Sequence, residues 1–543
     1  MTKNKYLNLA TMLGFMALLG MTYSCGDKQT KTERPNIVFI MSDDHAFQAL
    51  SAYEDKLINT PNIDRIAEEG MLFTNASVTN SICAPSRATI LTGKHAHIHG
   101  KIDNVFPFDT SNVTFPQILH DNGYQTAMFG KLHFGNNPKG IDEFKILPGQ
   151  GDYYNPRFIT NTGDTNIQGY VTDIITDLTI DWFENRREAD KPFMLFYLHK
   201  APHREWIPAP RHYKEFTKRT FPEPQTLFDD YEGRGTAARE AEMNLLKHMT
   251  ISADNKIYPE VAKELGVEEM SEWGFRVFKS KYARFTKEQK EQWDEVYGPI
   301  NEEFKDLYPA MDDSSFMRWK YQRYMQDYLA CIAAVDENVG RLMEYLKEND
   351  LSENTLVVYT SDQGFYLGEH GWFDKRFIYE ESFRTPLMMK WPKKIEPGTV
   401  TDEMVQNLDF AQTFLDAAGI EAPEDMQGES LMPLLKGNTD EWTRDAVYYH
   451  YYEYPGFHMV KRHYGIVTKD YKMAHFYYDI DEWELYDRKK DPLELNNVYH
   501  DPKYKDVVED LTRQLKALRA KYKDSKELDQ HFIEKYKERG IIK

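Results

Sequence analysis

Four apolar segments of strand length recur along the chain, and each ends abruptly in polar residues. They span residues 36–41, 125–129, 193–198 and 356–360. A continuous apolar run of this length is typical of a strand buried on both faces of a parallel sheet. The polar residues that follow are Ser42-Asp43-Asp44-His45, Gly130-Lys131-Leu132-His133, His199-Lys200-Ala201-Pro202-His203 and Ser361-Asp362-Gln363-Gly364. Because ligands of open α/β sheets bind beyond the carboxyl ends of the strands, these ends predict one shared site.

Helical patterns separate the four strands. A short helix begins at Thr60-Pro61 and ends near Gly70. A longer pattern, with apolar steps of three and four over residues 324–346, places Cys331 on its buried face, so we interpret this cysteine as structural. Strands that alternate with helices predict a doubly wound α/β fold.

Two regions depart from this alternation. Between about residues 204 and 320 the strand pattern is replaced by helical and irregular polar stretches, which we interpret as an insertion near the site. After Pro423, short aromatic-rich runs with turn residues between them predict a small antiparallel sheet. These runs span residues 447–453, 464–468, 471–477 and 483–486. An amphipathic helix marked by Leu511, Leu515, Leu518 and Tyr522 follows, so residues 423–543 are expected to form a smaller α+β domain.

Length and charge restrict the class of protein. The chain has 543 residues, which allows three or four domains, although large α/β enzymes often exceed the usual domain size. Acidic residues outnumber basic ones by 87 to 67, giving a formal charge of −20. This balance argues against a nucleic-acid partner, whose phosphates need a basic surface. An anionic substrate would need a locally basic pocket.

The N-terminus has the pattern of an export signal. Lys3 and Lys5 precede an apolar run over residues 7–21, which is too short for a transmembrane helix. Its end at Ser24-Cys25 resembles a bacterial lipoprotein cleavage site. We therefore expect residues 1–24 to be a signal peptide and residues 25–34 a spacer with a lipid anchor on Cys25. The mature protein is expected in the periplasm or as an outer-membrane lipoprotein of a bacterium.

One stretch carries more chemical information than any other: Ser81-Ile82-Cys83-Ala84-Pro85-Ser86-Arg87-Ala88-Thr89-Ile90-Leu91-Thr92-Gly93. Pro85 is placed like a first-turn proline, so Cys83 is expected at a helix N-terminus. The helix dipole favours negative charge there, which would activate the thiol. The alternative is that a single cysteine is a small buried hydrophobic residue.

This stretch resembles the signature of the type I sulfatases, C-x-P-S-R followed by an apolar pair, Thr and Gly. The resemblance implies that Cys83 is oxidised to formylglycine, by a formylglycine-generating enzyme or an anaerobic sulfatase-maturating enzyme. It also implies an alkaline-phosphatase-like fold: a doubly wound mixed sheet flanked by helices over residues 35–422, then a smaller C-terminal domain.

Two strand ends supply oxygen ligands for a metal. Asp43, Asp44, Asp362 and Gln363 offer three carboxylates and an amide oxygen, which favour Ca²⁺, with Mg²⁺ as the alternative. Each Asp pair alone is equally consistent with a turn or a helix cap. Sulfatases resemble this arrangement, usually with Asn where Gln363 stands, and the modified Cys83 completes the set of ligands.

Further catalytic residues follow from the resemblance. Gly123-Tyr124-Gln125-Thr126 and Gly130-Lys131-Leu132-His133 resemble the second sulfatase signature, which implies that Lys131 contacts the sulfate and His133 serves the formylglycine. His199 matches the family histidine that faces the leaving group, and Lys375 the second sulfate-binding lysine. A solvated surface loop is the alternative for such charged residues.

The implied mechanism is nucleophilic attack on sulfur by one hydroxyl of hydrated formylglycine. Ca²⁺, Lys131, Lys375 and Arg87 would balance the charge on the sulfate. His199 would protonate the departing sugar oxygen. The second hydroxyl would allow sulfate to leave by cleavage of its bond to carbon, with His133 as the base.

The substrate is predicted from local resemblance to bacterial N-acetylglucosamine-6-sulfatases at residues 199–210 and 454–458. It implies a 6-O-sulfated N-acetylglucosamine or N-sulfoglucosamine in heparan sulfate, keratan sulfate or mucin. The expected substrate-binding residues are His203, Asp374, Arg376 and His458. Three alternatives stay open: another carbohydrate regiospecificity, a phosphoesterase of the same superfamily, and a silent lipoprotein that binds sulfated glycan.

Overall fold

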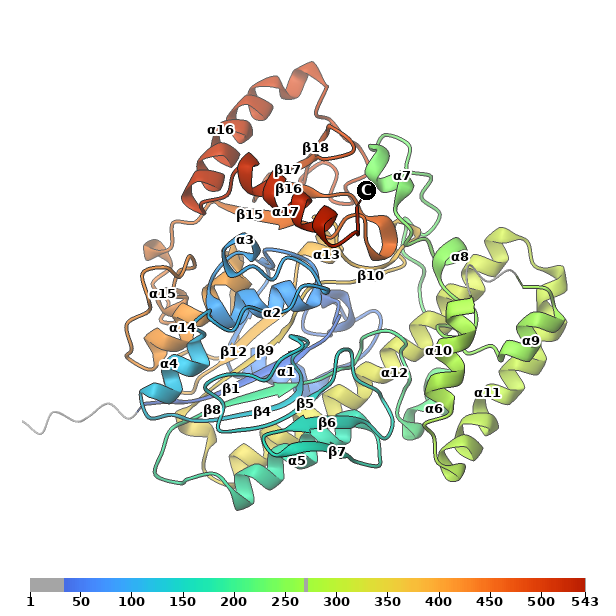
Figure 1. The fold of residues 1–543 in the computed structure, drawn as a ribbon, viewed down its shortest axis with the longest axis horizontal. Helices are drawn as coiled ribbons and strands as arrows, with labels where there is room; N and C mark the ends of the chain where they lie inside the picture. The colour runs from blue at the N-terminus through green and yellow to red at the C-terminus, as the bar shows by residue number, and fades with distance from the viewer. Residues whose placement is uncertain (1–33, 268–271, 543) are drawn as a thin grey trace, which may run out of the picture. The chain divides into compact units, whose positions relative to one another are not determined.

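Ten strands form one mixed sheet in the computed structural model, which describes residues 34–267 and 272–542 (Figure 1). Its centre is four adjacent parallel strands: β9 (Thr355–Ser361), β1 (Asn36–Ser42), β8 (Phe193–Leu198) and β4 (Gln125–Lys131). These are the four apolar segments predicted from the sequence. All four end at the same edge of the sheet, with Ser42 beside Ser361 and Met41 beside Leu198.

Shorter strands extend the sheet on both sides. They are β2 (Met71–Phe73), β5 (Glu143–Leu147), β6 (Arg157–Thr160), β7 (Gly163–Asn166), β12 (Leu387–Lys390) and β13 (Thr399–Thr401). The order is β13-β2-β12-β9-β1-β8-β4-β5-β6-β7, in which β12, β6 and β7 pair antiparallel with their neighbours. The sheet is therefore mixed, as expected.

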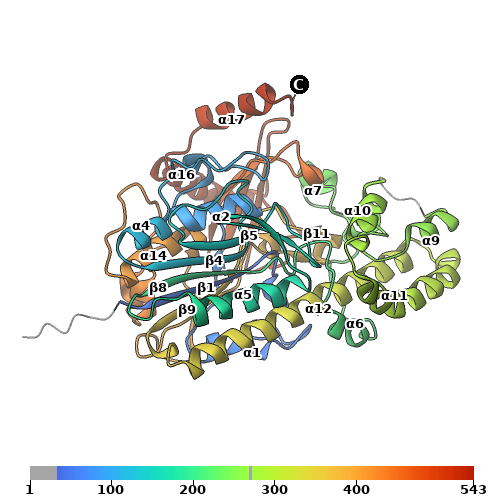
Figure 2. The ribbon, with the colours of Figure 1, turned by 60° about the horizontal axis from the view of Figure 1, so that its bottom comes forward.

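Both faces of the sheet are buried, which explains the continuous apolar character of the central strands. Along β1, Val38 and Ile40 pack into one core, and Phe39 and Met41 into the other. Helices cover each face, as Figure 2 shows. One layer holds α1 (Pro61–Glu68), α5 (Val171–Asn185) and α12 (Asp313–Glu348), and the other holds α2 (Cys83–Thr92), α4 (Phe115–Asp121) and α14 (Phe410–Ala417). The doubly wound architecture is confirmed.

The longest helix, α12, crosses the sheet with its apolar side inward. Cys331 belongs to this helix and is fully buried in the core that the helix forms with the sheet. This burial confirms its interpretation as a structural residue.

The described part of residues 204–320 contains helices and no strand. They are α6 (Pro210–Phe216), α7 (Thr236–Glu240), α8 (Leu245–His248), α9 (Pro259–Glu264), α10 (Glu272–Tyr282) and α11 (Lys287–Leu307). Figure 1 shows α8 to α11 grouped beside one end of α12.

A four-stranded antiparallel sheet follows in the C-terminal part. Its strands are β15 (Ala446–Tyr451), β16 (His463–Thr468), β17 (Tyr471–Phe476) and β18 (Glu482–Asp487). Their aromatic residues, such as Tyr448 and Tyr451, are core residues. Two helices pack with this sheet, α16 (Lys505–Lys521), which the sequence predicted, and α17 (Lys526–Glu538), which it did not.

The predicted signal peptide, residues 1–24, and Cys25 lie outside the described residues. Over residues 34–267 and 272–542, no helix combines the length and the apolar character needed to cross a membrane.

Candidate active site

Three aspartates meet where β1 and β9 end. Asp43 and Asp44 follow β1, and Asp362 follows β9, its parallel neighbour. One carboxylate oxygen of each lies within 4.8 Å of the others, and all three side chains are fully buried. The backbone of Asp44 turns with a φ of 66° and is held by a 2.7 Å hydrogen bond from the Tyr328 hydroxyl of α12 to its carbonyl oxygen. Strand order thus assembles the predicted carboxylate cluster.

Three cations neutralise these three carboxylates. Arg87 Nε lies 2.9 Å from Asp362 Oδ2, and Lys375 Nζ lies 2.8 Å from Asp44 Oδ2. Lys131 forms an ion pair with Asp43. All six side chains are buried, so each charge depends on its partner rather than on water.

The three carboxyl groups of the cluster have different pKa values. Burial and the nearby Asp43 raise the pKa of Asp362 to about 7, and burial raises that of Asp44 to about 6 against the charge of Lys375. For Asp43, burial is overcome by the charge of Lys131, which with His203 and Arg87 holds its pKa well below the usual range. Burial, with repulsion from Asp43 as a further cause, thus holds back the ionisation of two of the three groups.

The cluster fits a hard divalent cation such as Ca²⁺ or Mg²⁺. Its donors are oxygens, and two of these are buried without a hydrogen bond: Asp43 Oδ1 and Gln363 Oε1. The amide nitrogen of Gln363 faces Asp44 Oδ1, so half a turn of the amide would present its oxygen to a cation. The longer side chain of Gln therefore reaches the cluster.

Cys83 is the first residue of α2 and is fully buried, as predicted for a helix N-terminus. Its sulfur belongs to a second group, with Asp43 and His203, whose ligand atoms lie within 4.8 Å of one another. The expectation of an activated thiol is wrong, because burial raises the pKa of Cys83 well above its usual value. A neutral thiol in this position is a poor nucleophile.

Of the two candidate histidines after β8, only His203 lies in the cavity. His203 lines the cavity above Cys83, with its Nε2 3.8 Å from Asp44 Oδ2. His199 is fully buried with its ring against Tyr197, a residue of the core shared by α5 and α12, and neither of its ring nitrogens has a hydrogen bond. The structure therefore places His203, not His199, beside position 83.

Lys131 connects the cluster to residues that carry no motif. Besides Asp43, its Nζ contacts Gln150 Oε1, which the sequence did not single out. His133 follows with a φ of 68°, and burial and the charge of Lys131 hold its pKa well below the usual value. Gln150 lies between Gly149 and Gly151, both with positive φ, and this glycine-flanked turn is the only signal that the sequence offered.

A cavity of about 470 Å³ lies beside this cluster, with Lys375 and Gln150 in its wall. Of the four predicted substrate-binding residues, His203, Asp374 and Arg376 line it. His458 does not; its Nε2 lies 3.4 Å from Asp374 Oδ2, so it orients that carboxylate. Further lining residues that the sequence missed are Asn104, Glu453, Trp273, Tyr536 and Ile541, and Phe457 comes from the stretch 454–458 used for the substrate prediction.

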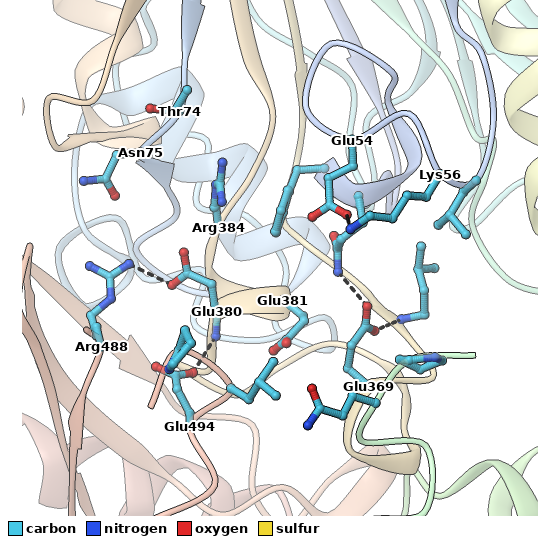
Figure 3. Close-up of a pocket in the computed structure, with 18 of the residues that line it drawn as sticks. Glu54, Lys56, Thr74, Asn75, Glu369, Glu380, Glu381, Arg384, Arg488 and Glu494 are labelled. Carbon is cyan, nitrogen blue, oxygen red and sulfur yellow. Dashed lines mark hydrogen bonds and ion pairs between the residues drawn. The ribbon is translucent and has the colours of Figure 1, made fainter. Parts of the chain in front are cut away.

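A larger cavity, of about 940 Å³, lies elsewhere and contains none of these residues (Figure 3). Polar side chains in its wall bond to one another: Arg488 Nη2 lies 3.0 Å from Glu380 Oε2, and Gln48 donates a 3.1 Å hydrogen bond to Glu369. Size alone does not mark the site here. The cavity beside Cys83 is the candidate active site, because the buried charges converge there.

The sequence model of the sulfatase family matches residues 35–420. The chain belongs to the sulfatase family. A second family model, N-sulphoglucosamine sulphohydrolase, C-terminal, matches residues 368–521 of this sulfatase. The sulfatase family match covers most of the chain and supports the sulfuric ester hydrolase activity expected from the Cys83 stretch.

Relatives of this sulfatase are similar over long stretches. It is 48% identical over 523 residues to an N-acetylglucosamine-6-O-sulfatase of Bacteroides thetaiotaomicron, and this match covers 95% of this chain and 92% of the relative. It is 27% identical over 444 residues to the N-acetylglucosamine-6-sulfatase of Homo sapiens, covering 77% of this chain and 67% of the relative.

One solved structure, of a protein in complex with its substrate D-glucosamine-2-N,6-O-disulfate, superposes on this chain with a TM-score of 0.86. The two are 48% identical, and the match covers 91% of this chain and 99% of the other. This likeness confirms the predicted alkaline-phosphatase-like fold.

Proposed function

We propose that this sulfatase removes the 6-O-sulfate of N-acetylglucosamine or N-sulfoglucosamine, with formylglycine at position 83 and Ca²⁺. The observation that carries the proposal is the buried cluster of three carboxylates and three cations around Cys83. Charge balance of this kind, open to a cavity on one side, suits an anionic ester and a divalent cation at once.

Formylglycine at position 83, once hydrated, would supply one hydroxyl for attack on sulfur and a second hydroxyl that would become the aldehyde oxygen again as the C–O bond to sulfate breaks. Asp43, Asp44, Asp362 and Gln363 would hold Ca²⁺, whose charge offsets that of the sulfate oxygens. The high pKa of the Cys83 thiol is consistent with this need for conversion, because the unmodified side chain stays protonated.

The protein's own cations bind and orient the ester. Lys131 and Lys375 reach the cluster from different elements, from the end of β4 and from the segment after β11 (Phe373–Asp374). Arg87, one turn after Cys83 in α2, holds Asp362 in place through its Nε. A sulfate beside Cys83 would draw both lysine ammonium groups from their carboxylates, which Ca²⁺ would then neutralise.

His203 is the residue best placed to give a proton to the leaving oxygen. It lines the cavity and lies within 4.8 Å of Cys83 Sγ. A sugar alkoxide is a poor leaving group, so a proton donor at this position lowers the barrier. His133, near Lys131 and with an unpartnered buried Nδ1, stays the proposed base for the second step.

The choice of sugar rests on the relatives and on the cavity. The relative from Bacteroides thetaiotaomicron is named for the 6-O-sulfate of N-acetylglucosamine, and the solved relative holds a 6-O-sulfated glucosamine. A volume of about 470 Å³ suits one sugar unit, and Asp374, Arg376 and Glu453 offer charged partners for hydroxyls. The export signal and Cys25 add the proposal that the enzyme works in the periplasm or on the outer membrane.

Peptide mass spectrometry across Cys83 on protein from its own host tests this proposal, together with sulfate release from 6-O-, 2-O-, 3-O- and 4-O-sulfated sugars. The expected result is formylglycine at position 83 and preference for the 6-O-sulfated glucosamine. An unmodified thiol in active enzyme would overturn the mechanism. An aryl phosphate turned over much faster than an aryl sulfate would favour a phosphoesterase instead.

A further inference from the structure

An aromatic pair stands in the wall of the active-site cavity. Trp273 comes from α10 of the insertion, and Phe457 from the 3₁₀ turn Phe457–Met459 that follows β15. Their ring centroids lie 6.2 Å apart with planes inclined by 57°. Phe457 is 52% exposed, whereas most aromatic residues of the described chain lie in the core. An exposed aromatic ring at a cavity mouth is a feature of ligand sites.

A buried arginine fixes the orientation of both rings. The guanidinium carbon of Arg204 lies 4.8 Å from the Trp273 ring and 5.9 Å from the Phe457 ring. Its Nε and Nη2 donate hydrogen bonds of 2.7 and 2.6 Å to the two oxygens of Asp254. Because Asp254 neutralises and holds the guanidinium, Arg204 serves as a rigid support rather than as a ligand for sulfate.

The segment that carries Phe457 is tied to the insertion and to the polar side of the cavity. The His458 carbonyl accepts a 2.8 Å hydrogen bond from Glu242 N, and its ring Nδ1 lies 2.6 Å from the Glu242 carbonyl oxygen. The same ring contacts Asp374 through Nε2. The aromatic wall and the Asp374 carboxylate therefore have a fixed relative position before any sugar binds.

We propose that Trp273 and Phe457 form a sugar-stacking subsite, which takes the apolar face of the pyranose whose sulfate lies at position 83. The inference rests on the proposed function and deepens it. A pyranose has an apolar face of C–H groups and a rim of hydroxyls. The cavity lining offers both kinds of surface: the two aromatic rings, and the polar side chains of Asp374, Arg376 and Glu453, with the Arg376 guanidinium carbon 5.9 Å from the Phe457 ring. Such a wall binds the sugar without touching the reacting atoms.

Steady-state kinetics of Trp273→Ala and Phe457→Ala with N-acetylglucosamine 6-sulfate test the subsite. Each variant is expected to raise KM about tenfold while kcat changes less than about twofold, because stacking on the ring is made equally in the ground and transition states. Trp273→Phe should restore most of the affinity. The inhibition constant of inorganic sulfate should stay unchanged, since sulfate contacts only the cations beside Cys83.

Phe228→Ala is the matched control. Phe228 is 45% exposed and lies under Arg318, 4.7 Å from its guanidinium carbon, but it does not line the cavity. KM values of both cavity variants within twofold of wild type, on the sulfated sugar that the wild type uses best, would overturn the subsite. Failure of the proposed function is a separate result, in which the wild type itself prefers a sugar other than the 6-O-sulfated glucosamine.

Discussion

The position of His203 beside Cys83, with His199 in the core, allows a direct test of which histidine is the general acid. If His203 donates the proton to the leaving sugar oxygen, His203→Ala should lose the full value of that proton transfer. General acid catalysis contributes about 10²- to 10⁴-fold in rate, equivalent to about 2.7–5.4 kcal/mol of transition-state stabilisation. The position supports a value in this range, because the His203 ring lines the cavity within 4.8 Å of Cys83 Sγ.

The leaving group separates this role from a structural one. With a 6-sulfated sugar, kcat of His203→Ala should fall by about 10²- to 10⁴-fold. With 4-nitrophenyl sulfate, whose phenolate leaves without a proton, the loss should stay below about tenfold. Burial and the charge of Lys131 lower the pKa of His203 in the free enzyme, but a bound anionic ester acts in the opposite direction.

His199→Ala is the comparison variant. Its imidazole fills the core against Tyr197, so removal should lower the free energy of unfolding by about 1–3 kcal/mol. Both substrates should then lose activity equally, and thermal denaturation should show a lower Tm. A leaving-group-dependent loss in His199→Ala, with none in His203→Ala, would refute the assignment.

Three further predictions concern the carboxylate cluster and the residues beside it. Prolonged chelation should abolish sulfate release and added Ca²⁺ should restore it, whereas Asp362→Asn should bind no Ca²⁺ in isothermal titration because it removes one of three convergent carboxylates. Gln363→Asn should keep Ca²⁺ affinity within about tenfold of wild type, since the amide oxygen is retained, while Gln363→Leu should lose more than that; equal affinities would show that Gln363 is no ligand. Tyr328→Phe removes the hydroxyl that bonds Asp44 O at 2.7 Å and Ala46 N at 2.9 Å, so denaturant titration should show a loss of about 1–3 kcal/mol, and an unchanged midpoint would contradict this.

The sheet could be predicted because the apolar composition of its central strands reflects their burial on both faces. Residues 37–41 of β1 are apolar without interruption since both faces of this strand are covered, and the same holds for residues 193–198 of β8 and 356–359 of β9. Because parallel strands end at one edge of a sheet, the sequence alone predicted that Asp43 and Asp362 lie close together. The strands β2 and β13 have only three residues each, which is too short for a comparable sequence signal.

The choice between His199 and His203 was beyond pattern reasoning. His199 comes directly after β8, where the chain leaves the sheet, and strand periodicity no longer fixes where a side chain points. The backbone path over residues 199–203 decides which imidazole enters the cavity. Trp273 and Tyr536 were missed for another reason: they reach the cavity from the insertion and from α17, and no motif links distant segments of this kind.

The resting cluster explains how one site can serve both a divalent cation and an anion. Three carboxylates face Arg87, Lys131 and Lys375, so the buried charges cancel and the protein tolerates them without a ligand. A divalent cation on the carboxylates would leave an excess of two positive charges, and a sulfate ester brings one negative charge. Binding of one therefore favours binding of the other, because the lysines released from Asp43 and Asp44 by the cation become the partners of the sulfate.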